Sequence, residues 1–379
     1  MAFAICSASP LLFMSTTNLS ANPGSSGQPD YFVYVGTYGK GVEGFRFNAG
    51  TGQLSPLGLV GEVVNPSFLT TDRDFKHLYA VSELEGNVAG GVASFAIDRS
   101  KGKLTLLNSV GSGGEAPCHL SVDHSGRMLI VANYVTGGVS AFPIKHDGKL
   151  GEMSALMTAQ GSGPNKERQD GPHAHEAVIA HDNKRVYVPD LGLDEIRIYK
   201  IEPSTGKLIP NHPATIKVEP GHGPRHIAFD AKSQYAYVIN ELKPLVTVFS
   251  VNEADGSLNQ IENVPTLPAD FKKDTTGAEI RIAPSGKFLY TTNRGSDTIQ
   301  VFSIDPNYGT LKQVQSVPAQ GEFPRGFALD PAGNFLILGN QKSNNLLVFK
   351  IDEKSGMLTY NGQTLQVPSP VDVLFVPAA

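Results

Sequence analysis

Short runs of apolar residues, or of apolar and polar residues in alternation, follow one another along the chain and are separated by turn residues. One unit contains four such runs, at 224–230, 235–241, 246–251 and from Leu258 onward. Alternation with a period of two is typical of β-strands, and no segment of helical length repeats its apolar residues about every 3.6 positions. We therefore expect an all-β protein built from four-stranded antiparallel sheets.

The same unit recurs along the chain in three independent columns of residues. The first runs begin at Pro66, Pro117, Ala174, Pro224, Gly277, Pro324 and Pro370, at intervals of 51, 57, 50, 53, 47 and 46 residues. Each third run carries one aromatic residue, at Phe45, Phe95, Phe142, Tyr199, Phe249, Phe302 and Phe349. A Gly-x-Leu motif follows each of them, beginning at Gly52, Gly102, Gly148, Gly206, Gly256, Gly309 and Gly356. Repeats of this length with four short strands predict a seven-bladed β-propeller.

The two ends of the chain supply complementary parts of one unit. The last unit contains a first run only, at Pro370–Pro377, whereas Tyr31–Val60 supplies second, third and fourth runs without a first. Pairing of the N-terminal strands with the C-terminal strand would complete the seventh sheet and close the ring without a loose edge. We therefore expect residues 31–379 to form a single propeller domain.

Composition is compatible with a turn-rich β protein and excludes several classes of partner. Hydrophobic residues make up 40% of the chain, which also contains 40 Gly and 26 Pro. A net charge of −5 argues against a nucleic-acid partner, and no apolar run is long enough to span a bilayer. With Cys6 and Cys118 as its only cysteines, the chain has no disulfide framework and no cysteine-based metal site. A small molecule is the expected partner.

Residues 1–30 differ from the rest of the chain. They contain no Lys, Arg, Glu or His, and the apolar stretch Ala2–Met14 is followed by Ser, Asn, Gly and Pro. An export signal would have such an apolar stretch but also a positively charged start, which is absent here. The segment is therefore interpreted either as a flexible tail or as the remnant of an export signal, and a cytoplasmic and an exported, periplasmic location both stay open.

Two columns of the repeat should surround one mouth of the central channel, because the start of a first strand and the end of a second strand lie together in an antiparallel blade. The first column holds Ser67, Cys118, His175, Arg225, Ala278, Arg325 and Val371. The second holds Thr37, Ser82, Asn133, Asp190, Asn240, Asn293 and Asn340, followed by Tyr38, Glu83, Tyr134, Leu191, Glu241, Arg294 and Gln341. We expect a binding site where these columns meet.

Five residues at this mouth break the repeat: His175, Arg225, Glu241, Arg294 and Arg325. A residue that closes a turn should recur in every blade, whereas a residue that serves a site need not. An isolated Arg or Glu usually forms a surface salt bridge. Convergence of five such residues on one mouth instead favours a functional pocket.

Other polar residues at this mouth are expected to contact a substrate: His173, His226, Asn240, Asn293, Arg325 and Gln341. The Asn column also has a structural explanation, because Asn closes turns through its own backbone. His226 can equally pack inside a blade. The longest connection between blades, Ala159–Pro172, is Gly-rich and charged, and we expect it to act as a lid or collar.

Cofactor motifs are not found in the sequence. His173 and His175 form a His-x-His pair, but no carboxylate or Cys stands with them at metal-ligand spacing. A Gly-rich phosphate loop and a Gly-x-Ser-x-Gly nucleophile elbow are also absent. The sequence therefore predicts a site without a metal or an organic cofactor.

Three segments resemble the seven-bladed propeller lactonase family, which includes bacterial 6-phosphogluconolactonases and the fungal enzyme that cyclises 3-carboxy-cis,cis-muconate. They are Pro224-Arg-His with Asn240-Glu241, Leu289-Tyr290 with Asn293-Arg294, and Phe323-Pro-Arg-Gly-Phe with Gln341-Lys-Ser. The resemblance covers Tyr31 to Pro377, with Ala174 where many relatives have Pro. It implies that the family's catalytic His, two Arg and Glu correspond to His175, Arg225, Glu241 and Arg294.

The resemblance implies hydrolysis of a small anionic lactone, most closely one like 6-phosphogluconolactone. Glu241 or His175 would activate water, Arg225 and Arg294 would hold the carbonyl oxygen, and Arg325 a distal anion. We expect net positive charge at this mouth, because the arginines outnumber the one carboxylate placed there. The alternatives are a carboxymuconate cycloisomerase and a propeller that only binds a partner protein.

Overall fold

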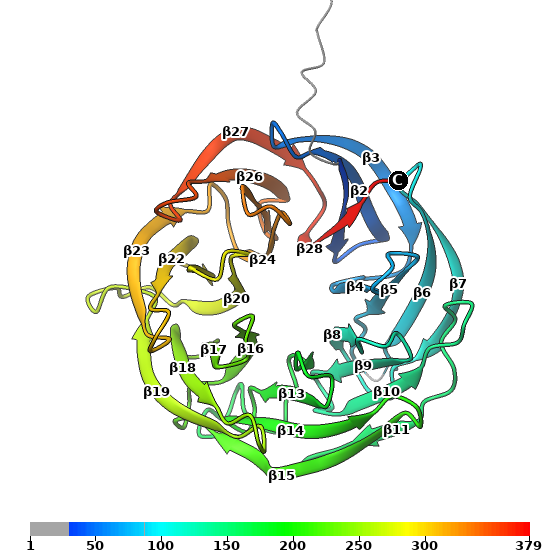
Figure 1. Ribbon diagram of the computed structural model, residues 1–379, viewed down its shortest axis with the longest axis vertical. Coiled ribbons are helices and arrows are strands. Elements are labelled where there is room, and N and C mark those ends of the chain that lie inside the picture. The colour runs from blue at the N-terminus through cyan, green and yellow to red at the C-terminus, as the bar shows by residue number, and fades with distance from the viewer. Residues whose placement is uncertain (1–29, 87) are drawn as a thin grey trace, which may run out of the picture.

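The computed structural model describes residues 30–86 and 88–379, which form seven four-stranded antiparallel sheets around a central axis (Figure 1). This arrangement confirms the predicted all-β, seven-bladed propeller. None of these residues belongs to a helix long and apolar enough to cross a membrane. Residues 1–29 lie outside the described part of the chain, so the expectation of a tail or signal remnant stays a prediction.

The strands of each blade are given from the central axis outward. Blade 1 contains β28 (Pro370–Pro377), β1 (Tyr31–Thr37), β2 (Gly41–Asn48) and β3 (Gln53–Glu62), and blade 2 contains β4 (Leu69–Thr71), β5 (His77–Ser82), β6 (Gly91–Asp98) and β7 (Lys103–Gly111). Blade 3 contains β8 (Pro117–Val122), β9 (Met128–Asn133), β10 (Val139–Pro143) and β11 (Ala155–Met157), and blade 4 contains β12 (Val178–Ile179), β13 (Arg185–Asp190), β14 (Glu195–Glu202) and β15 (Lys207–Lys217). Blade 5 contains β16 (Pro224–Phe229), β17 (Tyr235–Asn240), β18 (Leu245–Val251) and β19 (Leu258–Pro265), and blade 6 contains β20 (Thr276–Ile282), β21 (Phe288–Arg294), β22 (Thr298–Ile304) and β23 (Leu311–Pro318). Blade 7 contains β24 (Pro324–Leu329), β25 (Phe335–Asn340), β26 (Asn345–Ile351) and β27 (Leu358–Gln366).

The ring closes in blade 1, where the C-terminal strand β28 pairs antiparallel with β1. Tyr31 lies opposite Pro377, Val35 lies opposite Val373 and Thr37 lies opposite Pro370. The red end of the chain thus adjoins its blue beginning in one sheet (Figure 1). The predicted pairing of the two ends is confirmed, and it removes the free edge that an unclosed ring would present.

The hydrophobic core lies between blades. Within the described residues, one buried apolar cluster occupies each of the seven junctions between neighbouring blades. At the closing junction, Phe47 of blade 1 meets Phe335 of blade 7 edge to face, with ring centres 5.7 Å apart. Second strands such as β9 are buried along their whole length because blades cover both faces. Outer strands such as β7 are mostly exposed or half-buried, with Leu104 buried, so the more polar sequence runs correspond to strands covered on fewer sides.

A repeated hydrogen bond joins the Gly-x-Leu turns to the neighbouring blade. The hydroxyl groups of Tyr187, Tyr237 and Tyr290 donate to the carbonyl oxygens of the motif glycines in the next blade, at 2.8, 2.9 and 2.9 Å. These acceptors are Gly256, Gly309 and Gly356, and Tyr79 makes the same bond to Gly148 at 3.2 Å. The glycines have φ of +75°, +68°, +72° and +79°, which favours residues without a Cβ. The motif therefore serves both the turn and the junction.

Blade 4 departs from the repeat near its inner strand. The first run predicted from Ala174 is strand only at Val178–Ile179, and Ala174 makes a single bridge with Asp190. The side chain of Asp190 accepts hydrogen bonds from the backbone N–H groups of His173, Gly192 and Leu193 at 2.8 to 3.1 Å. These side-chain bonds replace strand pairing, so the chain before β12 enters the mouth of the ring as a loop.

Candidate functional site

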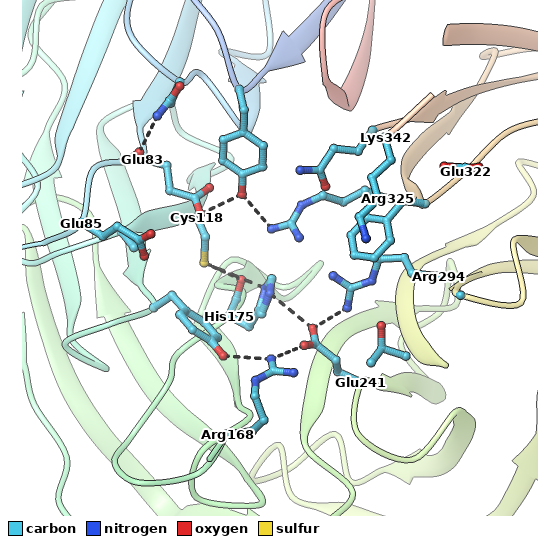
Figure 2. Close-up of a pocket in the computed structure, with 18 of the residues that line it drawn as sticks. Glu83, Glu85, Cys118, Arg168, His175, Glu241, Arg294, Glu322, Arg325 and Lys342 are labelled. Carbon is cyan, nitrogen blue, oxygen red and sulfur yellow. Dashed lines mark hydrogen bonds and ion pairs between the residues drawn. The ribbon is translucent and has the colours of Figure 1, made fainter. Parts of the chain in front are cut away.

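A cavity of about 930 Å³ opens on the face of the ring where first strands begin and second strands end (Figure 2). Loops from all parts of the ring contribute to its wall. The residues used below are Tyr38, Glu83, Cys118, Tyr134, Arg168, His175, Glu241, Arg294, Phe323, Arg325, Gln341 and Lys342. The two columns of the repeat therefore meet at one cavity.

Glu241 is the centre of the charged network in this cavity. Its Oε2 atom lies 2.8 Å from Nη2 of Arg294 and 3.1 Å from Nε of Arg225. Its Oε1 atom accepts a hydrogen bond from Nη2 of Arg168. Burial opposes ionisation of Glu241, but Arg294 and Arg225 hold the pKa of its carboxyl group well below 4.5. The carboxylate is therefore charged and is held by three guanidinium groups.

Arg225 and Arg294 are fixed by the backbone as well as by Glu241. Both are buried, and Arg294 donates a hydrogen bond to the carbonyl oxygen of Gly277 at 2.9 Å. Arg225 donates to the carbonyl oxygen of Ala278 at 2.5 Å. Burial lowers the pKa of Arg294 to about 10, so its guanidinium group keeps its charge at neutral pH. The two arginines form a rigid cationic floor, although Arg225 does not itself line the cavity.

His175 lies beside this floor. Its Nε2 atom is 3.9 Å from Oε2 of Glu241, which is too far for a hydrogen bond. Burial and the charge of Arg225 lower the pKa of the imidazole well below 6.5, so the ring is neutral at pH 7. Cys118 donates from Sγ to the carbonyl oxygen of His175 at 3.2 Å, and the ring of Tyr134 lies 5.3 Å away. A neutral imidazole can accept a proton, which an imidazolium cannot.

A second group of polar residues lies on the opposite wall. Arg325 donates from Nη2 to the hydroxyl oxygen of Tyr38 at 3.0 Å, and this hydroxyl donates to Oε1 of Glu83 at 2.8 Å. The Arg325 guanidinium also lies over the Tyr38 ring, 5.4 Å from its centre. Nearby, the guanidinium of Arg294 and the ammonium of Lys342 both lie over the Phe323 ring, 5.2 and 4.3 Å from its centre. This wall can bind a second anionic group of a ligand.

The charge of the cavity differs from the expected one. Besides Glu241, its lining contains the carboxylates Glu83, Glu85, Asp274, Asp297 and Glu322, against the cations Arg168, Arg294, Arg325 and Lys342. Glu85, Asp274 and Glu322 are exposed, so they form an acidic rim above the cationic floor. The expectation of net positive charge over the whole mouth is wrong. Asp274 and Glu322 come from loops before β20 and β24, whose paths the repeat does not specify.

The remaining predicted substrate contacts have mixed positions. Gln341 and Arg325 line the cavity, whereas His173, His226, Asn240 and Asn293 do not.

The two asparagine side chains form structural hydrogen bonds, Asn240 inside blade 5 and Asn293 across to Thr266, which follows the outer strand of blade 5. Asn240 donates from Nδ2 to Oγ1 of Thr247 at 2.9 Å, and Asn293 accepts from Oγ1 of Thr266 at 3.0 Å. Both side chains are therefore structural, although these partners are threonine hydroxyl groups and not the backbone of the turn.

The two histidines contact cavity residues from outside the lining. His226 is buried, with Nδ1 3.1 Å from Oε1 of Glu279, and its ring centre lies 5.1 Å from that of His175. His173 stacks on the Tyr134 ring, with centres 4.7 Å apart. Both histidines therefore reach the cavity through a neighbour.

Arg168 and Tyr134 were not selected from the sequence. Tyr134 stands in the second column beside Asn133, but its position gave no reason to separate it from the turn residues. Arg168 belongs to the long connection between β11 and β12. The sequence could have indicated it only as a charged residue in a loop on the same face as the site. The expected lid or collar thus supplies a guanidinium group to Glu241.

The chemistry of the cavity follows from these contacts. Guanidinium groups bind planar anions and the oxyanion of a reacting carbonyl, and a neutral imidazole accepts a proton from water. Within residues 30–86 and 88–379, no three His, Cys, Asp or Glu side chains are grouped in a way that could hold a metal ion. The residues present are suited to hydrolysis of an ester-like bond.

The chain is similar in sequence and structure to proteins named as lactonases. Residues 32–375 match the family model described as "Lactonase, 7-bladed beta-propeller". The chain is 36% identical to the 6-phosphogluconolactonase of Bacillus subtilis over 350 residues, covering 91% of this chain and 98% of the relative. It is 36% identical to the 6-phosphogluconolactonase of Formosa agariphila over 307 residues, covering 79% of this chain and 86% of the relative. The solved structure of the Pseudomonas aeruginosa periplasmic gluconolactonase superposes with a TM-score of 0.88 at 32% identity, covering 92% of this chain and 100% of that one.

Proposed function

Because the chain belongs to the family of seven-bladed β-propeller lactonases, we propose that it hydrolyses the ring ester of a sugar lactone, most closely 6-phosphogluconolactone. The relatives from Bacillus subtilis and Pseudomonas aeruginosa are named for substrates of this type. The observation that carries the proposal is the network around Glu241, in which three guanidinium groups lie next to the neutral imidazole of His175. Lactone opening requires both an oxyanion partner and a proton acceptor.

His175 is the better candidate for the general base. A carboxylate that three arginines stabilise is a weak proton acceptor, which disfavours Glu241 in this role. His175 takes a proton from water while the water oxygen bonds to the ring carbonyl carbon. The bond between that carbon and the ring oxygen then breaks, and the ring oxygen takes the proton from the imidazolium. The product is an open-chain hydroxy acid whose carboxyl group ionises at neutral pH.

Arg294 stabilises the charge that develops on the carbonyl oxygen, and Arg225 is a positioning residue. Arg294 lines the cavity, and Arg225 supports it through Glu241. Both guanidinium groups are already held by backbone carbonyl oxygens, so little reorganisation is needed when the negative charge appears. Glu241 orients the two arginines and balances part of their charge.

Arg325 binds the distal anion of a phosphorylated substrate. Tyr38 holds its guanidinium group on the wall opposite His175, and Lys342 adds a second cation nearby. The carboxylates of the rim repel a phosphate group. Binding of a phosphorylated substrate therefore depends on the cations of this wall.

The experiment is a hydrolysis screen of δ-gluconolactone and its 6-phosphate, with spontaneous opening subtracted. We expect turnover of at least one, and in Arg325→Lys a loss of about 10- to 100-fold in kcat/KM that is larger for the phosphorylated lactone. Arg127→Lys, at an exposed position far from the cavity, is the matched control. Absence of enzymatic opening of every sugar lactone tested would contradict the proposed function, and equal losses on both substrates would contradict the role of Arg325.

A further inference from the structure

Arg168 differs from the other arginines around Glu241 in how it reaches the site. Arg225 belongs to β16 and Arg294 ends β21, whereas Arg168 lies in the loop between β11 and β12. In Figure 2 its side chain rises toward Glu241 from the side opposite Arg294. Its side chain is 38% exposed, against 3% and 5% for Arg225 and Arg294. Arg168 therefore faces the open part of the cavity.

The loop that carries Arg168 is well fixed. The neighbouring Gln169 is fully buried and donates from Nε2 to the carbonyl oxygen of Leu191 at 2.9 Å. Its own Oε1 accepts a hydrogen bond from the backbone N–H of Asn165 at 3.1 Å, and its backbone N–H donates to the Asn165 carbonyl oxygen at 2.7 Å. The backbone under Arg168 is thus held in place, while the guanidinium group can change partners.

The contacts of Arg168 are suited to such an exchange. Its Nη2 atom bonds to Oε1 of Glu241 and, at 3.2 Å, to the hydroxyl oxygen of Tyr134. Within the described residues, no hydrogen bond ties this guanidinium group to the backbone, unlike those of Arg225 and Arg294. Arg168 pairs with Oε1 of Glu241, and the other two arginines pair with Oε2. Glu241 therefore keeps two cationic partners if Arg168 turns away.

We propose that Arg168 is a substrate-binding residue that exchanges Glu241 for the carboxylate that lactone opening creates. This inference rests on the proposed function. Opening turns a neutral ester into an anion, and a cation at the exposed side of the cavity can follow that change. One carboxylate partner replaces another, so Arg168 stays paired before and after the reaction. Its planar fork also suits a carboxylate better than a lysine ammonium would.

The test is binding of D-gluconate to the full chain by calorimetry, alongside product inhibition of lactone hydrolysis. We expect Arg168→Ala to raise the Kd and the inhibition constant of gluconate about 10- to 100-fold, the loss typical of a hydrogen-bonded ion pair. Arg168→Lys should lie between Arg168→Ala and the wild type. Lys166→Ala, at an exposed position of the same loop, is the matched control and should bind as the wild type does.

The readouts separate ligand binding from a purely structural role. If Arg168 only held the loop, Arg168→Ala would unfold more easily but bind gluconate with the wild-type Kd, and that result would overturn the inference. Failure of the wild-type chain to bind gluconate would overturn it too. Because binding is measured without turnover, a chain that binds gluconate through Arg168 but opens no lactone would count against the proposed function alone.

Discussion

The junctions between blades and the mouth of the ring use the same repeat in opposite ways. At the junctions, equivalent residues make equivalent contacts, as in the bonds from Tyr237 to Gly309 and from Tyr290 to Gly356. At the mouth, equivalent positions hold different residues: Glu241 and Gln341 occupy the same column, as do His175 and Arg325. Residues that repeat from blade to blade therefore stabilise the ring, and residues that interrupt the repeat mark the site.

The two regions also differ in how polar groups are satisfied. At the junctions, neutral hydroxyl groups donate to backbone carbonyl oxygens inside apolar clusters. At the mouth, buried charges hold one another, and removal of one partner would leave the others uncompensated. Substitutions at the junctions should thus affect folding, whereas substitutions of the paired charges at the mouth should affect both chemistry and folding.

The largest expected effect is on the closing junction. Deletion of residues 370–379 removes β28, leaves the inner edge of β1 unpaired and takes Val373 and Phe375 out of the core between blades 7 and 1. We expect the truncated chain to lose cooperative unfolding, measured by circular dichroism during thermal denaturation. Deletion of Ala378 and Ala379 alone is the control. Wild-type unfolding of the longer deletion would show that the ring does not depend on β28.

At the mouth, His175→Asn should lower kcat/KM for the lactone by about 10²- to 10⁴-fold, because the proposed base is lost. The free energy of unfolding should change little, because the ring of His175 makes only weak polar contacts. In the described structure its nitrogens lie 3.9 Å from Sγ of Cys118 and 3.9 Å from Oε2 of Glu241. The measurement is steady-state hydrolysis together with denaturant unfolding. His181→Asn, at an exposed position of blade 4, is the control. If both variants keep full activity, His175 is not the base.

The pH dependence of the lactonase reaction sharpens the same contrast. Burial and Arg225 lower the pKa of His175 well below 6.5, so the imidazole stays neutral, and able to accept a proton, at a lower pH than an exposed histidine would. As the pH falls, kcat/KM should therefore decline only below 6.5. The profile is measured from about pH 5 to 8, with spontaneous opening subtracted at each pH. A half-maximal value at or above pH 6.5 would exclude His175 as the titrating base.

The smallest expected effect tests one repeated bond at a junction. Tyr290→Phe removes the hydrogen bond to Gly356 and should lower the free energy of unfolding by about 1 kcal/mol, with kcat/KM unchanged. Tyr34 stands at the corresponding position of blade 1, but its buried hydroxyl group has no hydrogen-bond partner in the described structure. Tyr34→Phe should therefore be neutral or slightly stabilising. Equal losses in both variants, measured by denaturant unfolding, would show that the bond to Gly356 adds nothing.

The sequence by itself determined the fold and the neighbourhood of the site. Blade number, the closing pair of strands and the buried aromatic column are all local patterns that recur, so each copy checks the others. His175, Glu241, Arg294 and Arg325 were found because they interrupt that recurrence, and the structure brings all of them to one cavity. Strand period and turn chemistry are properties of neighbouring residues, which is why the sequence alone predicts them.

Only the tertiary structure decided how the charges at the mouth are paired. Arg168 lies 73 residues from Glu241, and the path of its loop depends on Gln169 and Leu191 rather than on any repeat. The acidic rim depends in the same way on loops before β20 and β24. Asn240 looked like a site residue in sequence but bonds inside its own blade. Contacts between distant loops do not follow the sequence repeat. The sequence therefore predicts which columns of residues approach the mouth but not which side chains contact one another.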